Sequence, residues 1–282
     1  MTDIPRDVAV AANIQVHSAL ATTGEYNRSP HFREENQAKV RAVLEGLIEE
    51  STIDGPTRLL DVGCGTGFIV HMVHDLVDRV DGIDITDDMM SLIDTSTGNI
   101  HLQNARAEEL PFDDSSFDFA TAYSFLDHLT SYGDVFKEVY RVLKPGGVFY
   151  SDLNPNKHFS LLMEDMEVGP KEILPAIVSR EIEGMLHNGE YWEQKFGIDS
   201  EAITNAEPIK SFSKGFDADE VVEFARNTGF SEARYVYDWY LGQAVVMHEQ
   251  SFEQSALVEE YLRMALPATR GLFKYLRFIL VK

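Results

Sequence analysis

The stretch Leu59-Leu60-Asp61-Val62-Gly63-Cys64-Gly65-Thr66-Gly67-Phe68 decides the fold of this chain. A short apolar run leads into a glycine-rich turn, and a second apolar segment follows. This order predicts a buried strand, a loop and a helix, whose first N–H groups can hold a nucleotide-like ligand. Phe68 occupies the place of the third glycine of the dinucleotide fingerprint, and no Gly-Lys-Ser or Gly-Lys-Thr follows. The loop is therefore typical of neither a pyrophosphate site nor a P-loop.

A second anchor lies 23 positions after Asp61, where Asp84 closes the segment VDGIDI. Residues 80–84 predict a strand, and a carboxylate at the carboxyl end of such a strand can accept both hydroxyls of an adenosine ribose. A glycine loop alone would be equally consistent with a structural turn. The loop together with this strand-end acid favours a ligand site.

Strands and helices alternate on both sides of the loop. A helix is expected from Ser29 as N-cap and Pro30, with an apolar face that runs from Val40 to Ile48. The later expected elements are helix 67–78, strand 80–84, helix 87–95, strands 100–103 and 117–122, helix 132–143 and strand 147–153. Such alternation predicts a parallel sheet that is covered on both faces.

The alternation stops after Pro155. Residues 156–210 show no strand rhythm, and we expect an irregular insertion over the ligand-binding edge of the sheet. The core pattern resumes at Asp217, which is expected to cap a helix that Gly229 ends. A strand near 232–241, a helix near 252–266 and a terminal strand complete the pattern. Tyr235, Tyr237 and Trp239 alternate along the first of these strands and are expected in the core.

Composition limits the classes of function. The 282 residues carry 24 Lys and Arg against 47 Asp and Glu, a net charge of −23, which disfavours nucleic acid and anionic lipid as partners. The same charge suits a cationic or neutral small substrate, and it is also what a soluble or salt-adapted protein shows. Cys64 is the only cysteine, so an intrachain disulfide and a Cys-based zinc cluster are excluded. No apolar run reaches the ~18–20 residues that span a bilayer, and no signal-peptide pattern begins the sequence, so we expect a cytoplasmic protein.

Six motifs in order carry a resemblance to a known family. They are LLDVGCGTGF (59–68), GIDIT (82–86), AEELPF (107–112), FDFATA (117–122), LDHL (126–129) and VLKPGG (142–147). With these motifs the chain resembles a class I S-adenosylmethionine-dependent methyltransferase of the type 11 group. The resemblance implies a Rossmann-like, doubly wound α/β fold whose seven-stranded sheet is mostly parallel with the last strand antiparallel. It also implies S-adenosyl-L-methionine as cofactor and S-adenosyl-L-homocysteine as product.

The expected organisation follows from the motifs. Residues 1–50 form an N-terminal arm and helix, 51–155 the cofactor-binding core, 156–213 a lid or substrate insertion, and 214–282 the C-terminal part of the core.

The resemblance also implies a set of cofactor contacts. Asp61 supports the loop, and Asp84 binds the ribose hydroxyls. Arg106 stands where related proteins often place an acid for the adenine amino group, and a cation cannot accept that hydrogen bond. Adenine recognition therefore passes to the Ala107 N–H, to Glu108 or to a neighbouring carbonyl. The full set is Tyr26, Arg33, Asp61, Gly63, Cys64, Gly65, Asp84, Ile85, Met89, Arg106, Ala107, Glu108, Tyr123, Ser124 and His128.

A methyl group on a sulfonium is already activated, so the protein has to align the acceptor and exclude water. No metal is required, and no His-Glu-x-x-His motif or cysteine–histidine cluster at ligand spacing occurs in the sequence. A hydroxyl acceptor would benefit from a base, whereas an amine attacks once it is neutral. The catalytic candidates are His128, Asp127, Tyr26 and His31, with His158 as a further candidate base.

Substrate contacts are expected from the insertion and from the end of the fifth strand. Tyr191 and Trp192 are the preferred contacts, and Asn154 is a third. The segment Asp152–Asn156 either faces the pocket or shapes the turn.

These observations predict transfer of a methyl group to an oxygen or nitrogen of a small metabolite by in-line, metal-independent displacement. Three alternatives stay open. They are a methyltransferase acting on tRNA or protein, a nicotinamide-dependent oxidoreductase, which Phe68 disfavours, and a non-catalytic cofactor-binding subunit.

Overall fold

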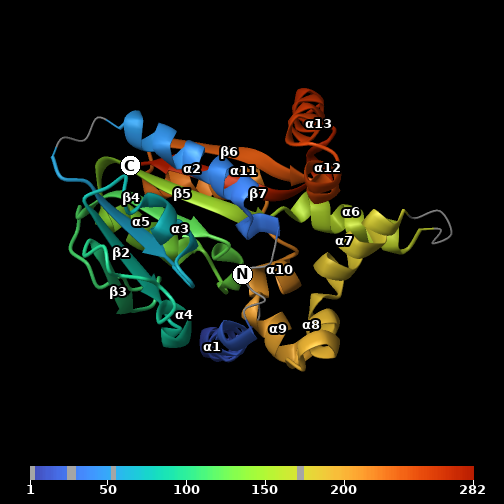
Figure 1. Ribbon diagram of the computed structural model, residues 1–282, viewed down its shortest axis with the longest axis horizontal. Coiled ribbons are helices and arrows are strands. Elements are labelled where there is room, and N and C mark those ends of the chain that lie inside the picture. The colour runs from blue at the N-terminus through green and yellow to red at the C-terminus, as the bar shows by residue number, and fades with distance from the viewer. Residues whose placement is uncertain (1–3, 24–29, 52–54, 170–174) are drawn as a thin grey trace.

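The computed structural model describes residues 4–23, 30–51, 55–169 and 175–282. One seven-stranded sheet organises it, with the strand order β3-β2-β1-β4-β5-β7-β6 (Figure 1). The first five strands are parallel, and β7 is antiparallel to both of its neighbours. The strands are β1 Arg58–Val62, β2 Arg79–Asp84, β3 Ile100–Asn104, β4 Phe117–Tyr123, β5 Leu143–Pro155, β6 Glu232–Tyr240 and β7 Phe273–Val281. The predicted fold class is confirmed.

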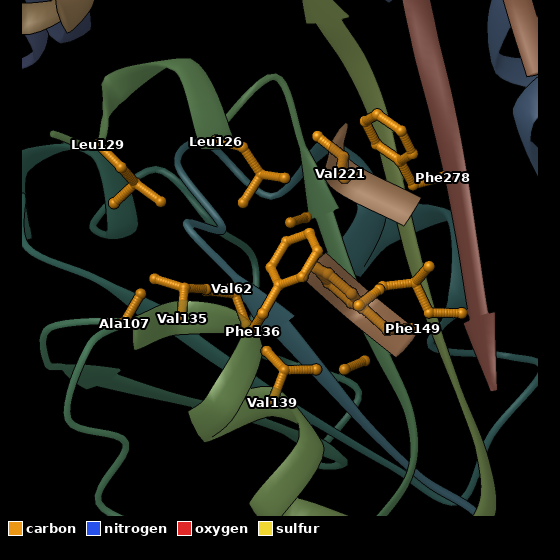
Figure 2. Close-up of a cluster of buried hydrophobic side chains, with 14 of the residues drawn as sticks. Val62, Ala107, Leu126, Leu129, Val135, Phe136, Val139, Phe149, Val221 and Phe278 are labelled. Carbon is orange, nitrogen blue, oxygen red and sulfur yellow. The ribbon is translucent and has the colours of Figure 1, made fainter. Parts of the chain in front are cut away.

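Both faces of the sheet are buried, as a doubly wound fold requires. Successive residues of β1 point to opposite faces: Leu60 joins a cluster with α5 (Gly133–Val142) and α11 (Ala218–Thr228), and Leu59 joins a cluster with α2 (Glu34–Glu49) and α3 (Phe68–Val73). Figure 2 shows the first cluster, where Phe136 of α5 packs between Val62 and Phe149. The continuous burial of β1 and β4 explains why these strands read as apolar runs.

Several predicted helix boundaries are wrong. Instead of one helix from Pro30, a 3₁₀ turn η2 (Pro30–Phe32) precedes α2, and extended backbone at Arg33 separates them. Helix α3 ends at Val73, and Asp78, which accepts a hydrogen bond from the Thr57 N–H at 2.7 Å, directly precedes β2. Helix α4 covers only Asp87–Met90, and the Ser91 hydroxyl bonds back to the Asp88 carbonyl at 2.7 Å.

The predicted irregular insertion is wrong as well, because the described residues between 156 and 213 form five helices. Asn156 caps the first of them and Asp199 caps the fourth through their side chains. Most of their buried apolar side chains pack against each other and against α1 (Arg6–Thr23), whereas Ile209 of α10 joins the cluster on the sheet. The strand–helix rhythm on which the sequence pattern relies is therefore lost. The five are α6 Lys157–Glu167, α7 Ala176–Leu186, α8 Asn188–Phe196, α9 Ser200–Ala206 and α10 Pro208–Ser213.

The C-terminal elements follow the prediction closely. Asp217 caps α11 by accepting from the Asp219 and Glu220 N–H groups, and Gly229 ends the helix. After β6 come α12 (Gln243–Glu249), α13 (Phe252–Met264) and the 3₁₀ turn η5 (Arg270–Leu272). The expected alternation fails at Trp239, whose φ of +56° turns its ring to the opposite core cluster from Tyr237. Both rings are nevertheless buried.

Figure 1 shows α1 and α9 side by side below the sheet, next to α4. Three buried apolar residues of α1, Ala12, Val16 and Leu20, pack in one cluster with Ile203 and Ala206 of α9. Among the residues that the structure describes, no helix has the length and apolarity needed to cross a membrane.

Candidate functional site

The glycine loop after β1 is held against the end of β2. The N–H groups of Gly63 and Cys64 both donate to the Ile83 carbonyl at 2.9 Å. The Gly65 N–H donates to Asp84 Oδ2 at 2.9 Å, and Asp84 Oδ1 accepts from the Thr86 N–H at 2.8 Å. Asp84 therefore both orders the loop and presents a carboxylate at the carboxyl edge of the sheet, where α/β folds bind ligands.

A cavity that opens to solvent lies over this edge. It begins at the ends of β1, β2 and β4, and α1 covers it from outside. The residues of the expected cofactor set that line it are Gly63, Gly65, Asp84, Ile85, Met89, Ala107, Glu108, Ser124 and His128. Side chains of α1 complete the wall, namely Arg6, Ala9, Val10, Asn13 and His17.

Two residues of the expected set lie behind the loop instead of in the cavity. Asp61 is buried, accepts from Thr121 Oγ1 at 2.7 Å, and has its pKa raised to about 7 by burial. The Cys64 side chain packs in the core beside Gly82, and burial raises the pKa of its thiol. These positions fit a role in supporting the loop better than a direct contact through the side chain.

Arg106, where the sequence departs from the family pattern, connects the core to α1. Its guanidinium lies 3.6 Å from Asp7 of α1 and 3.7 Å from Glu108. Arg6 adds pairs to Glu108 at 3.5 Å and to Asp134 at 2.8 Å. The first turn of α1 is thus held by charge pairs at the cavity rim.

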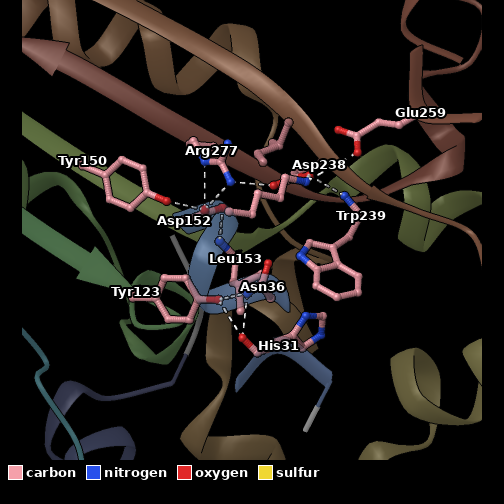
Figure 3. Close-up of polar contacts among 12 residues, drawn as sticks. His31, Asn36, Tyr123, Tyr150, Asp152, Leu153, Asp238, Trp239, Glu259 and Arg277 are labelled. Carbon is pink, nitrogen blue, oxygen red and sulfur yellow. Dashed lines mark hydrogen bonds and ion pairs between the residues drawn. The ribbon is translucent and has the colours of Figure 1, made fainter. Parts of the chain in front are cut away.

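The expected arm over the cofactor, residues 26–33, does not line this cavity where it is described. Tyr26 lies outside the described residues. His31 packs edge-on against Trp239, with ring centroids 4.3 Å apart, and burial lowers its pKa to about 3. Arg33 is exposed at the start of α2. Tyr123 does not line the cavity, and its hydroxyl accepts a hydrogen bond of 2.9 Å from Asn36 Nδ2 (Figure 3). Helix α1, which the sequence analysis treated only as part of an arm, provides the cover instead.

A second cavity of about 460 Å³ adjoins the first, and His17, Ser124 and His128 line both. Trp192 lines it, with its indole N–H donating to Asn188 Oδ1 at 2.9 Å. Tyr191 is 44% exposed and does not reach it. The other wall residues are Val16, Leu20, Asn188, Ile203, Ala206 and Glu207.

The end of β5 shapes the sheet instead of a pocket. Asn154 is buried, donates to the Leu276 carbonyl at 3.0 Å, and accepts from Ser151 Oγ at 3.1 Å. Asn156 caps α6, and Asp152 binds Arg277 at 2.7 Å. Of the two alternatives for this segment, the turn is the one that the contacts support.

Of the catalytic candidates in this region, His128 lines the cavities, whereas Asp127 and His158 do not. His128 lies at the junction of the two cavities, and its Nδ1 is 2.8 Å from the Ala206 carbonyl. Asp127 is buried behind it, and burial raises its pKa. His158 lies in α6, 3.8 Å from Asp217, and lines neither cavity.

Sequence reasoning missed Asn13, His17 and Glu207. Asn13 and His17 are one helical turn apart, and Asn13 Nδ2 donates to the His128 carbonyl at 3.2 Å. Their polar i, i+4 spacing inside the apolar pattern of α1 was a usable signal. Glu207 stands before Pro208 at a helix start, a pattern that on its own indicates only a helix boundary.

Comparisons with known proteins agree with this geometry. A family model described as a methyltransferase domain matches residues 60–151. A demethylmenaquinone methyltransferase from Staphylococcus epidermidis is 31% identical over 141 residues, 48% of this chain and 58% of that protein. One from Listeria monocytogenes is 36% identical over 99 residues, 32% of this chain and 42% of that protein.

A solved structure shares the fold across nearly the whole chain. It is a complex from Haloferax volcanii between the Trm112 methyltransferase activator and a protein described as a methyltransferase. The match has a TM-score of 0.53 at 17% identity and covers 94% of this chain and 96% of that chain. At this identity the likeness concerns the fold alone. The chain spans about half the length of the curated relatives it matches.

Proposed function

We propose that this chain is a class I S-adenosylmethionine-dependent methyltransferase, as its match to a methyltransferase domain over residues 60–151 supports, and that it methylates a small molecule that binds in the second cavity. One observation carries the proposal. Two cavities meet at His17, Ser124 and His128, so that a cofactor in the first and an acceptor in the second would face each other there.

The first cavity fits the cofactor by the chemistry of its walls. Gly63 and Gly65 let the backbone form one wall, and the Asp84 carboxylate suits the ribose hydroxyls. Ile85 and Met89 offer apolar surface for adenine, and Ala107 and Glu108 lie on the same wall. When bound, S-adenosylmethionine supplies an activated methyl group. The chain's own task is to orient the acceptor in line with it and to exclude water, which α1 does by covering the cavity.

The second cavity supports a small, partly apolar acceptor. Val16, Leu20, Ile203 and Trp192 give it apolar walls, whereas Asn188 and Glu207 add polar groups at defined places. Its walls come from α1 and α9 among others, and this position under two helices favours a small acceptor over a folded tRNA or protein. The net charge of −23 further disfavours an RNA acceptor.

Thermal unfolding with S-adenosylmethionine, S-adenosylhomocysteine and NAD in parallel tests the cofactor. A ligand at ~100 times its Kd adds about 2.7 kcal/mol to the native state, which raises Tm by roughly 5–10 °C. We expect this rise with both S-adenosyl compounds and none with NAD. A rise with NAD alone would contradict the proposal.

A paired substitution locates the ribose contact. Asp84→Asn keeps one of the two acceptor oxygens that bind the Gly65 and Thr86 N–H groups and removes the charge. We expect a more than tenfold loss of S-adenosylhomocysteine affinity by calorimetric titration. Asp88→Asn, on the exposed face of α4, is the matched control and should bind like the unmodified protein. Equal affinities in all three proteins would remove Asp84 from the ribose site.

Transfer of tritium from methyl-labelled S-adenosylmethionine tests the acceptor class. The protein is offered a panel of small phenols and amines, total tRNA and a protein extract in separate reactions. We expect label in the small-molecule fraction. Label only in tRNA or protein would overturn the assignment of the second cavity.

A further inference from the structure

His128 is fixed in one tautomer by its surroundings. Its Nδ1 lies 2.8 Å from the Ala206 carbonyl oxygen, which can only accept a hydrogen bond. Nδ1 therefore carries the hydrogen, and in the neutral ring Nε2 carries a lone pair. Within the described residues no hydrogen bond reaches Nε2. A lone pair is thus available on a ring that lines both cavities.

Two carboxylates stand close enough to stabilise a positive charge on this ring. Asp127, His128 and Glu207 each place one oxygen or nitrogen atom within 4.8 Å of the others. Asp127 is 6% exposed, and its Oδ1 has no hydrogen-bond partner. Burial acts to raise the pKa of Glu207, but Lys210 and His128 outweigh it, so the pKa is lowered and Glu207 is ionised at neutral pH.

Glu207 is held in place by two donors on neighbouring helices. Lys210 Nζ is 2.7 Å and Asn188 Nδ2 is 3.2 Å from Glu207 Oε2. The positive charge of Lys210 lies close enough to Glu207 and Asp127 to favour the ionised form of both. The same charge would repel a divalent metal ion bound between them. The arrangement therefore suits a proton on His128 better than a divalent metal shared by the three side chains.

The neighbouring histidine is less suited to take a proton. His17 of α1 meets His128 edge-on, with ring centroids 4.9 Å apart. Burial, reinforced by the charge of His128, lowers its pKa to about 4. The groups that face His128 are thus His17 from α1, Asp127 from η3 (Leu126–His128), Glu207 before α10 and Lys210 within α10.

We infer that His128 Nε2 is the general base of the transfer, that Glu207 positions and stabilises it, and that the acceptor is a small amphipathic phenol or amine. The inference rests on the proposed function and deepens it. As the new bond to the methyl carbon forms, the S–CH₃ bond breaks and its electron pair stays on sulfur. The proton of the acceptor's O–H or N–H group moves to Nε2, so an imidazolium, a neutral thioether and the methylated acceptor result.

Nitrogen NMR of histidine-labelled protein tests the tautomer without any acceptor. With S-adenosylhomocysteine bound, we expect the His128 signals, assigned by their loss in His128→Gln, to show a protonated Nδ1 and a bare Nε2 at alkaline pH. A protonated Nε2 with a bare Nδ1 would overturn the inference. Failure of S-adenosylhomocysteine to bind at all would instead overturn the proposed function.

Single-turnover transfer to 4-ethylphenol and to phenethylamine tests the base. His128→Ala should lose ~10²–10⁴-fold in single-turnover rate at saturating cofactor, and added imidazole should restore part of it. His101→Ala, on the exposed side of β3, is the control and should keep the full rate. A full rate in His128→Ala overturns the base, and no transfer to either probe by the unmodified protein that binds cofactor overturns the acceptor class.

Glu207→Gln separates positioning from simple packing. The amide keeps the shape but not the charge, so we expect a lower kcat, an unchanged KM for the cofactor, and an acid limb of the pH–rate profile that moves to lower pH. A packing role alone would leave the profile in place and contradict the inference. Loss of activity in EDTA that Mg²⁺ restores would also overturn it, because the three side chains would then hold a metal.

Discussion

Gly63 makes a close backbone approach at the cofactor cavity. A Cβ built on it would lie 2.1 Å from Phe125 Cδ2, and its φ of +72° is unfavourable for any other residue. Gly98 has a similar φ of +81° but no atom within 4 Å of such a Cβ. Substitutions at the two glycines therefore distinguish the cost of left-handed backbone, which both share, from the steric conflict with Phe125, which only Gly63 has.

We predict that Gly98→Ala lowers the free energy of unfolding by about 1–2 kcal/mol, which is the cost of placing a residue with a Cβ in left-handed backbone. Gly63→Ala should lose more, and its affinity for S-adenosylhomocysteine should fall more than tenfold, because the Phe125 ring that lines the cavity has to move. Urea unfolding and calorimetric titration measure both quantities. Equal losses in the two variants, with binding intact, would contradict the role of Gly63. The double variant Gly63→Ala/Phe125→Ala should recover part of the binding.

Asp61 is predicted to make stability depend on pH. Burial raises its pKa to about 7, so between about pH 4 and 7 the folded protein binds a proton that the unfolded chain has released. Stability must therefore fall as pH rises through this window, by up to ~4 kcal/mol from this group. Asp61→Asn has no carboxyl group at this position and therefore lacks this loss of stability. Measured without cofactor, the free energy of unfolding of Asp61→Asn minus that of the unmodified protein should become more positive from pH 4 to pH 7. Asp88→Asn should show no such trend, and a flat difference for Asp61→Asn would refute the assignment.

Helix α1 is the element that closes the cofactor cavity. Its contacts are of two kinds, charge pairs at the rim through Arg6 and Asp7, and apolar packing of Val16 and Leu20 on α9. Exposed ion pairs contribute little, so the apolar contact should govern how often the helix opens. Ile198 belongs to that contact but lines neither cavity.

We predict that Ile198→Ala speeds the dissociation of S-adenosylhomocysteine by roughly tenfold or more, because losing buried packing of this kind costs ~2–5 kcal/mol. Amide hydrogen exchange should rise in α1 and α9 and not in the sheet. Val8→Ala, in α1 and 44% exposed, is the control. Unchanged dissociation in Ile198→Ala would show that α1 does not limit cofactor release.

At the scale of the whole molecule, Arg277 ties together three strands and a helix (Figure 3). Its guanidinium lies 2.7 Å from Asp152 of β5 and 2.6 Å from Asp238 of β6, and Lys39 of α2 reaches Asp238 at 2.6 Å. Each aspartate also accepts from the next N–H, at Leu153 and Trp239, both of which have left-handed backbone. The network therefore fixes two bends on either side of β7.

We predict that Arg277→Met loses about 3–5 kcal/mol in the free energy of unfolding, because it leaves buried carboxylates without their counter-charge. Burial opposes ionisation of Asp238, but the charges of Lys39 and Arg277 outweigh burial and lower the pKa of Asp238. The ionised carboxylate therefore stabilises the folded protein at pH values above the ordinary aspartate pKa. This stabilisation is lost as the pH falls through the lowered pKa of the folded state. In Arg277→Met the penalty should shrink between pH 7 and pH 4, because Asp238 can take up a proton. Lys39→Met, whose side chain is 23% exposed, should cost less. A penalty that does not change with pH would contradict this account.

The sequence by itself determined the fold class and the place of the proposed cofactor site. Both depend on local patterns: apolar strands in alternation with helices, a glycine loop directly after β1, and Asp84 at the end of β2. Neighbouring parallel strands bring their carboxyl ends to one edge, so these residues meet whatever the rest of the chain does.

Only the tertiary structure decided what covers that edge and which groups face an acceptor. His17, His128 and Glu207 come from segments as far apart as α1 and the start of α10, and no pattern of spacing relates them. Their meeting depends on how short helices pack on each other, which follows from side-chain shape instead of periodicity. The same reason places His31 and Asn154 away from the cavities, since His31 packs on Trp239 and Asn154 donates to the Leu276 carbonyl. Arg33 is exposed at the start of α2.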